Sequence, residues 1–238
     1  MKRTTLLLLS LFFFMLMISG CAEKSENDRV VIGNLAPVEG DLVYDISTIE
    51  GATECADLIV MGKINKLIET TVSDETDLPQ FLYEVEILKI YYDRHSVLSV
   101  KDTVKFSSRS GYMPAIEYAE HMSKSKRGQK FNIAQDDYSS NEYFEFASFG
   151  SLAFDIEKTY IMFLDNDSPA TSPVYREATY TQMYEISNSN LKQGTTKNIS
   201  DFSLPELETA IYSAVSNRSG ELDDGLTAYL EKQNNQDK

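Results

Sequence analysis

The sequence predicts a mainly β protein with flanking helices (α+β), in which a small antiparallel barrel is followed by C-terminal helices. Two observations predict this class. Segments with alternating apolar and polar residues recur between residues 57 and 186, which is the period of half-buried strands. After residue 203 the apolar residues take helical spacing instead. A hydrophobic fraction of 42% and an aromatic fraction of 11% are sufficient for a packed core in this 238-residue chain.

The chain begins with a segment typical of export. Lys2 and Arg3 precede the apolar run 6–18, whose length matches the ~7–15 residues of a signal-peptide core. The run falls short of the ~20 residues that a membrane-spanning helix needs. It ends at residues 18–21, ISGC, which resemble the lipobox of bacterial lipoproteins. The resemblance implies that residues 1–20 are a signal peptide, cut between Gly20 and Cys21. An ordinary secreted protein or an uncleaved membrane anchor are the alternatives.

The same resemblance implies that Cys21 carries a diacylglyceryl group. One acyl chain anchors a protein only marginally, whereas two chains anchor it stably. We therefore expect a protein bound to the cell membrane by lipid and facing the extracytoplasmic side. Residues 21–40 are polar and lack periodicity, which predicts a flexible tether that spans roughly 24 Å as a coil.

The charge of the chain limits its partners. The net charge of −15 becomes −17 once Lys2 and Arg3 are removed with the leader. Such a charge repels nucleic acid, so we expect no nucleic-acid partner. Lipidation of Cys21 would leave Cys55 as the one remaining cysteine, which excludes an internal disulfide in the monomer. Cys55 lies beside apolar residues and is expected to pack as a small buried side chain.

We expect the β-rich domain to cover residues 41–190 and to begin with a short helix. Ser47 and Glu50 have the S-x-x-E spacing of a capping box, in which the serine caps the helix and the glutamate reaches back to it. This spacing predicts a helix from Ser47 to about Cys55. A strand should then begin directly, because the following residues are β-branched.

Three strands are predicted next. Residues 57–71 alternate over most of their length, and Gly62 is the expected position of a bulge or bend. Residues 80–92 alternate in the same way, so the two segments predict an antiparallel hairpin. A third, short strand is predicted at 102–107.

A long connection interrupts the strand pattern. Residues 108–141 show little alternation and are expected to form a long loop, in which residues 112–122 could hold a helical turn or two. The pattern returns at 142–149 and 158–164, each predicted as a strand. Residues 174–186 are predicted to form a further strand or a hairpin.

The C-terminal part, 191–238, is predicted to be a helical extension with a polar tail. Ser203 and Glu206 have capping-box spacing, and a proline stands in the first helical turn, where its missing N–H costs nothing. The pattern predicts a helix over 204–217. A second, weaker helix is expected over 221–232.

Three segments resemble a known domain family. Residues 55–64, CADLIVMGKI, look like the "A-D-x-V-x-x-G-x-V" opening of netrin-like and tissue-inhibitor-of-metalloproteinase-like domains. Residues 85–89, VEILK, and the strand within 154–164 are similar to two later motifs of that pattern. The resemblance implies an OB-like, five-stranded barrel over about 46–164. Protease inhibition does not carry over, because the chain lacks the cysteines that those inhibitors use to chelate metal.

Residues with recognisable chemistry are few. The two histidines, His95 and His121, cannot build a multi-histidine zinc site, and no H-E-x-x-H or G-x-S-x-G motif occurs. We therefore expect no metal and no cofactor. Against the acidic background one basic cluster could contact an anionic surface, although a solvated loop is the alternative; its members are Lys124, Lys126, Arg127 and Lys130.

These observations favour a lipid-anchored extracytoplasmic binding module without catalytic activity. Its ligand would be a peptide, a protein or an envelope polymer. One alternative is a cell-envelope hydrolase that uses paired carboxylates, drawn from acids such as Asp136, Asp137 and Glu142, because two carboxylates suffice for glycoside hydrolysis. A purely structural or immunity lipoprotein is the other alternative.

Overall fold

A computed structural model describes ten segments of the chain: 29–35, 48–73, 75–125, 138–147, 152–166, 174–178, 183–187, 190–193, 198–199 and 202–218. The expected signal peptide 1–20, the lipidation site Cys21 and the second C-terminal helix at 221–232 lie outside these segments.

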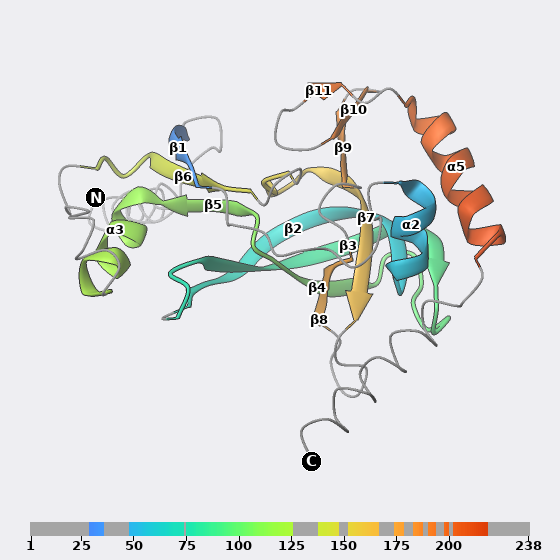
Figure 1. The fold of residues 1–238 in the computed structure, drawn as a ribbon, viewed down its shortest axis with the longest axis horizontal. Helices are drawn as coiled ribbons and strands as arrows, with labels where there is room; N and C mark the ends of the chain where they lie inside the picture. Colours follow the sequence, from blue (N-terminus) through green and yellow to red (C-terminus); the bar gives the residue numbers. More distant parts are fainter. Residues whose placement is uncertain are drawn as a thin grey trace, which may run out of the picture.

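Strands make up most of the described structure, with helices at both ends (Figure 1). In chain order the elements are β1 (Val30–Asn34), α2 (Ile49–Cys55), β2 (Leu58–Val72), β3 (Pro79–Asp93), β4 (Thr103–Ser108), β5 (Gly111–Pro114), α3 (Ala115–Lys124), β6 (Glu142–Phe146), β7 (Thr159–Asn166), β8 (Val174–Glu177), β9 (Tyr184–Ser187), β10 (Asn190–Gln193), β11 (Asn198–Ile199) and α5 (Leu204–Ser216). The prediction of a mainly β chain with flanking helices is confirmed.

The strands form two sheets. The smaller has the order β1-β6-β5, and the larger has the order β11-β10-β9-β7-β2-β3-β4-β8. Strand β7 pairs with β8 as well as with β2, so β2, β3, β4, β8 and β7 close into a ring of hydrogen-bonded neighbours. Within the ring the pairing of β4 with β8 is parallel, and the other pairings are antiparallel.

The predicted hairpin of residues 57–71 and 80–92 is confirmed as β2 and β3, which pair along their whole length. The register of this pairing shifts between Met61 and Gly62, which is the predicted bulge. A Cβ atom at Gly62 would lie 2.5 Å from Cγ1 of Val85. Glycine is therefore required where the two strands bend together.

Alternation along β2 divides its side chains between two cores. Leu58, Val60 and Ile64 are buried inside the ring, where they meet aromatic residues of β3, β4 and β8. Ile59 points to the outside of the ring and belongs to a second cluster, built with α2, α5 and strands β7, β9 and β10. Both faces of β2 are thus buried near its beginning, which explains why the sequence there is apolar without interruption.

Helices α2 and α5 lie side by side over the outer cluster (Figure 1). The capping box predicted for α5 is confirmed: the Glu206 carboxylate accepts hydrogen bonds from the backbone N–H (2.8 Å) and the hydroxyl (2.6 Å) of Ser203. The cap predicted for α2 is wrong by one residue. Thr48, not Ser47, is the N-cap, and its hydroxyl oxygen accepts from the N–H of Gly51 at 3.1 Å.

Three sequence-based boundaries need correction. Within the expected tether 21–40, residues 30–34 form β1, which pairs in parallel with β6. The expected loop 108–141 contains β5, and the helical turns expected within 112–122 extend to the ten-residue helix α3. The expected helical extension 191–238 contains most of β10 and all of β11. Each missed strand is five residues or shorter. Such strands are fixed by pairing with distant segments rather than by their own pattern.

Candidate functional site

A polar pocket of about 220 Å³ lies where β4, β7 and β8 meet. Its lining consists of Gln80, Ser107, Ser108, Arg109, Asp165, Arg176 and Glu177. Charged groups of both signs therefore face one small volume. Pockets that combine convergent polar groups with titratable residues are the usual starting point for a functional hypothesis.

Strand pairing brings these residues together. Arg176 of β8 stands opposite Ser107 of β4 and opposite Asp165 of β7. Gln80, near the start of β3, donates a hydrogen bond from Nε2 to Oγ of Ser107 at 2.8 Å. Arg109 follows directly after β4. The pocket is thus assembled around the one parallel pair of the ring.

Glu177 is the most perturbed carboxyl group of the pocket. Burial raises its pKa from 4.5 to about 7, and the Ser108 hydroxyl and the Arg109 charge only partly oppose this increase. The Ser108 hydroxyl donates a hydrogen bond to Oε1 of Glu177. The backbone N–H of Ser110 in turn donates to Oγ of Ser108 at 2.8 Å, which fixes the orientation of that hydroxyl. Glu177 therefore exchanges a proton near neutral pH.

Asp165 is the second perturbed carboxyl group. Burial raises its pKa, and the neighbouring Asp57 raises it further, while Arg176 lowers it. Asp57 is held by the Arg94 guanidinium at 2.6 Å and accepts the backbone N–H of Asn166 at 3.1 Å. A side-chain hydrogen bond between Asp165 and Asp57 acts in the same direction and keeps the pKa of Asp165 raised.

The pocket offers three kinds of polar group to a ligand. Arg109 and Arg176 are exposed and supply guanidinium donors, which suit carboxylates or phosphates. The Gln80 amide offers a donor and an acceptor. Asp165 and Glu177 change from donors to acceptors as they lose their protons. Such a set matches a ligand that carries an anionic group beside hydroxyl or amino groups.

The residues singled out from sequence do not form this pocket. Lys124 ends α3, away from the lining residues, and its ammonium group lies 2.7 Å from Oε1 of Glu120 on the exposed surface. Lys126, Arg127 and Lys130 lie outside the described residues. The same applies to Gly20 and Cys21 of the lipidation site.

The carboxylates considered for a hydrolase also lie elsewhere. Asp136 and Asp137 are outside the described residues. Glu142 starts β6 and accepts the backbone N–H of Ser139 at 2.8 Å, so it closes a turn. Sequence reasoning missed Arg109, Arg176 and Glu177 because charged residues at strand ends are common and nothing in their spacing links them.

Comparison with known proteins gives no relative: no protein-family model matches the chain, and no curated protein matches its sequence. In the part of the chain that the structure describes, no helix is long and apolar enough to cross a membrane. The described residues also contain no group of three or more His, Cys, Asp or Glu side chains that could hold a metal ion.

Proposed function

We propose that the protein is a lipid-anchored extracytoplasmic binding module that holds a polar envelope ligand in the pocket between β4, β7 and β8. The observation that carries this proposal is the convergence of two guanidinium groups with two carboxyl groups of raised pKa in one small pocket. A ligand with carboxylates next to amino or hydroxyl groups satisfies both sets. Cell-wall polymer with peptide side chains has this chemistry.

We infer that the ring of five strands is an OB-type barrel. Two features support this interpretation. The ring has five members, and neighbours in the ring are not always neighbours in sequence, because β4 lies beside β8 rather than β7. Both features are typical of a five-stranded Greek-key barrel. In that class one face of the barrel strands binds the ligand together with two of the loops.

Removal of the two pocket guanidinium groups is expected to weaken ligand binding. In the double variant Arg109→Ala/Arg176→Ala, affinity for soluble peptidoglycan fragments should fall tenfold or more, since a hydrogen bond to a charged group contributes about 1.5–3 kcal/mol. Titration calorimetry with purified fragments measures this change. The matched control is Lys101→Ala/Lys105→Ala, which removes two exposed positive charges, one just before β4 and one within it, that do not line the pocket.

Incubation of the protein with the same peptidoglycan fragments distinguishes a binding module from a hydrolase. Asp165 and Glu177 line one pocket, and a glutamate with a pKa of about 7 suits a general acid, so paired-carboxylate hydrolysis is the second candidate function. Chromatography of the fragments shows which function applies. Intact fragments with measurable affinity support the binding module. Smaller products that disappear in Glu177→Gln support the hydrolase, and equal affinity of both double variants contradicts the pocket as the site.

Replacement of Cys21 by serine is expected to release the protein from the membrane. The serine hydroxyl cannot form the thioether that would carry the diacylglyceryl group, so both acyl chains are lost. Fractionation of cells should therefore move Cys21→Ser from the membrane to the soluble or secreted fraction. Mass spectrometry of the N-terminal peptide gives the independent readout. A wild-type peptide without acyl mass would contradict the proposed anchor.

A further inference from the structure

The residues that line the pocket between β4, β7 and β8 lie at different depths. Arg109 and Arg176 are exposed and form its mouth. Ser107 and Ser108 are 7% and 4% exposed and form its floor. Glu177 is half-buried and is held by the Ser108 hydroxyl, which donates a hydrogen bond to its Oε1. A ligand that enters the pocket therefore passes guanidinium groups first and meets a carboxyl group behind them.

The floor of the pocket favours a ligand group that donates hydrogen bonds. The single proton of the Ser108 hydroxyl is directed at Glu177, and the Ser108 oxygen accepts the backbone N–H of Ser110 at 2.8 Å. An ionised Glu177 has acceptor oxygens only. An ammonium group gains most from such a position, because hydrogen bonds between two charged partners are stronger than those between neutral partners.

The charges that line the pocket balance one another. Arg109 and Arg176 contribute two positive charges, and Asp165 and Glu177 contribute two negative charges when both are ionised. A ligand with one positive and one negative charge keeps this balance, whereas a purely anionic ligand would add a negative charge beside two carboxylates. The net charge of −15 on the whole chain also disfavours an anion that has no compensating ammonium group.

The size of the pocket limits how much of a ligand can enter. Its volume of about 220 Å³ is below the ~300–1,000 Å³ of pockets that enclose a drug-sized molecule. The pocket therefore admits one end of a ligand and not a length of polymer. An end group that carries opposite charges a short distance apart can contact the mouth and the deeper carboxyl group together.

Charged and titratable groups from four strands surround Glu177 in the part of the chain that the structure describes. Arg109, directly after β4, acts on Glu177 through its positive charge. Burial raises the pKa of Tyr83 on β3, and negative charges that include Glu177 raise it further. Asp165 of β7 and Arg176 of β8 line the same pocket. The arginines stay charged and Tyr83 stays neutral at pH 7, so a bound ligand can change the protonation of the two carboxyl groups only.

We propose that the pocket binds a zwitterionic end group, in which an ammonium and a carboxylate are attached to one carbon, as at the free end of a diamino dicarboxylic acid residue. The ligand carboxylate lies on the guanidinium groups of Arg109 and Arg176, and the ammonium group lies against Glu177. The inference rests on the pocket proposed above as the binding site and names the part of the ligand that this pocket recognises. Glu177 is then the residue that distinguishes an ammonium group from an acetylated amine.

This orientation requires that binding releases a proton from Glu177. A positive charge beside a carboxyl group lowers its pKa. Burial gives Glu177 a pKa of about 7 in the free protein, so about half of the molecules carry this proton at pH 7. About half a proton per bound ligand should therefore be released at that pH. A ligand that placed a carboxylate against Glu177 would have the opposite effect and would take up a proton.

Three synthetic muropeptides test the inference on the full-length protein. The first ends in meso-diaminopimelate, whose free end carries an ammonium and a carboxylate on one carbon. In the second this amine is acetylated, and in the third lysine keeps the ammonium group but lacks that carboxylate. Titration calorimetry at pH 7, in two buffers of different ionisation enthalpy, gives the affinity and the number of protons exchanged. We expect the second and third peptides to bind about tenfold more weakly than the first, which should release about half a proton.

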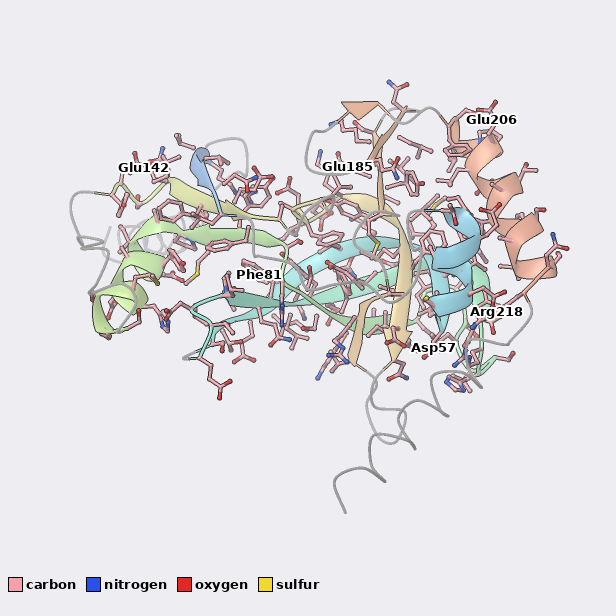
Figure 2. The ribbon with its side chains drawn as sticks, viewed as in Figure 1. Asp57, Phe81, Glu142, Glu185, Glu206 and Arg218 are labelled. Atoms are coloured by element: carbon pink, nitrogen blue, oxygen red, sulfur yellow. The ribbon has the colours of Figure 1, made fainter. Side chains whose placement is uncertain are left out.

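Variants of the protein assign the two contacts. In Glu177→Gln, the advantage of the free amine over the acetylated amine should disappear, together with the proton release. In Arg109→Ala/Arg176→Ala, the advantage of the diaminopimelate peptide over the lysine peptide should disappear. The matched control is Glu206→Gln, because Figure 2 shows Glu206 at the start of α5, well away from β4, β7 and β8. This control should bind all three peptides as the wild type does.

The possible failures separate this inference from the proposed function. If the peptides bind the wild type equally well and the double arginine variant poorly, the zwitterionic end group is overturned and the pocket remains the binding site. Proton uptake in place of release, or a preference for the free amine that survives in Glu177→Gln, overturns the contact between the ammonium group and Glu177. Absence of binding by all three peptides overturns the proposed function and the inference with it.

Discussion

Replacement of Phe154 by alanine is expected to lower the free energy of unfolding by about 3–5 kcal/mol. The Phe154 ring is 2% exposed and lies inside the ring of five strands. Its centre lies 5.0 Å from that of Phe106 and 5.1 Å from that of Tyr160, and both pairs meet edge to face. The five strands around Phe154 are hydrogen-bonded in a closed ring. They therefore cannot move inward to fill the cavity that alanine would leave.

Urea denaturation followed by circular dichroism measures this loss. The matched control is Phe202→Ala, which makes the same chemical change at a residue that is 39% exposed. The control should cost clearly less than Phe154→Ala, since Phe202 keeps 39% of its surface in water and belongs to neither buried cluster. Similar losses at both positions would show that the interior of the ring is not the main source of stability.

The parts of the fold that sequence could predict are those with a strong local pattern. Residues of β2 and β3 alternate over most of 15 positions each, so their hairpin could be recognised without knowledge of the rest. Helix α5 carries its own start signal in Ser203 and Glu206. In both cases the information lies within a short stretch of chain.

The pairing of β1 with β6 could not be predicted in this way. More than 100 residues separate Val30 from its partner Glu142, and neither strand is longer than five residues. Four or five residues give too few alternations to distinguish a strand from a polar linker. The register between such strands is decided by packing against the rest of the fold.

The candidate site was hidden for the same reason. Arg109 and Arg176 come from segments that are about 70 residues apart, and they share a pocket because β4 and β8 lie parallel. A parallel neighbour cannot be read from sequence when the connection between the strands contains other elements. The perturbed pKa of Glu177 likewise depends on burial that only the folded chain creates.

Replacement of Glu177 by glutamine is expected to make the protein more stable at pH 8. The folded-state pKa of about 7 lies above the ordinary value of 4.5, so the folded protein holds a proton that the unfolded chain releases. The stabilisation of the folded state by protonated Glu177 is fully present below pH 4.5 and is lost as the pH rises to about 7. Since one unit of pKa difference corresponds to 1.36 kcal/mol, the free energy of unfolding lost in this way is roughly 3 kcal/mol. Glutamine keeps an acceptor for the Ser108 hydroxyl and carries no charge.

The pH dependence of the difference between Glu177→Gln and wild type provides the measurement, because titrations common to both proteins cancel. The gain in unfolding free energy should be largest at pH 8 and should shrink as pH falls towards 4.5. Glu206→Gln is the control of opposite sign: Ser203 lowers the pKa of Glu206, so this variant should lose stability at pH 8 and approach wild type in acid. A loss of stability in Glu177→Gln at pH 8 would mean that the ionised carboxylate stabilises the fold. The expected gain instead means that Glu177 lowers stability at neutral pH, which is the usual cost of a polar group kept in a binding site.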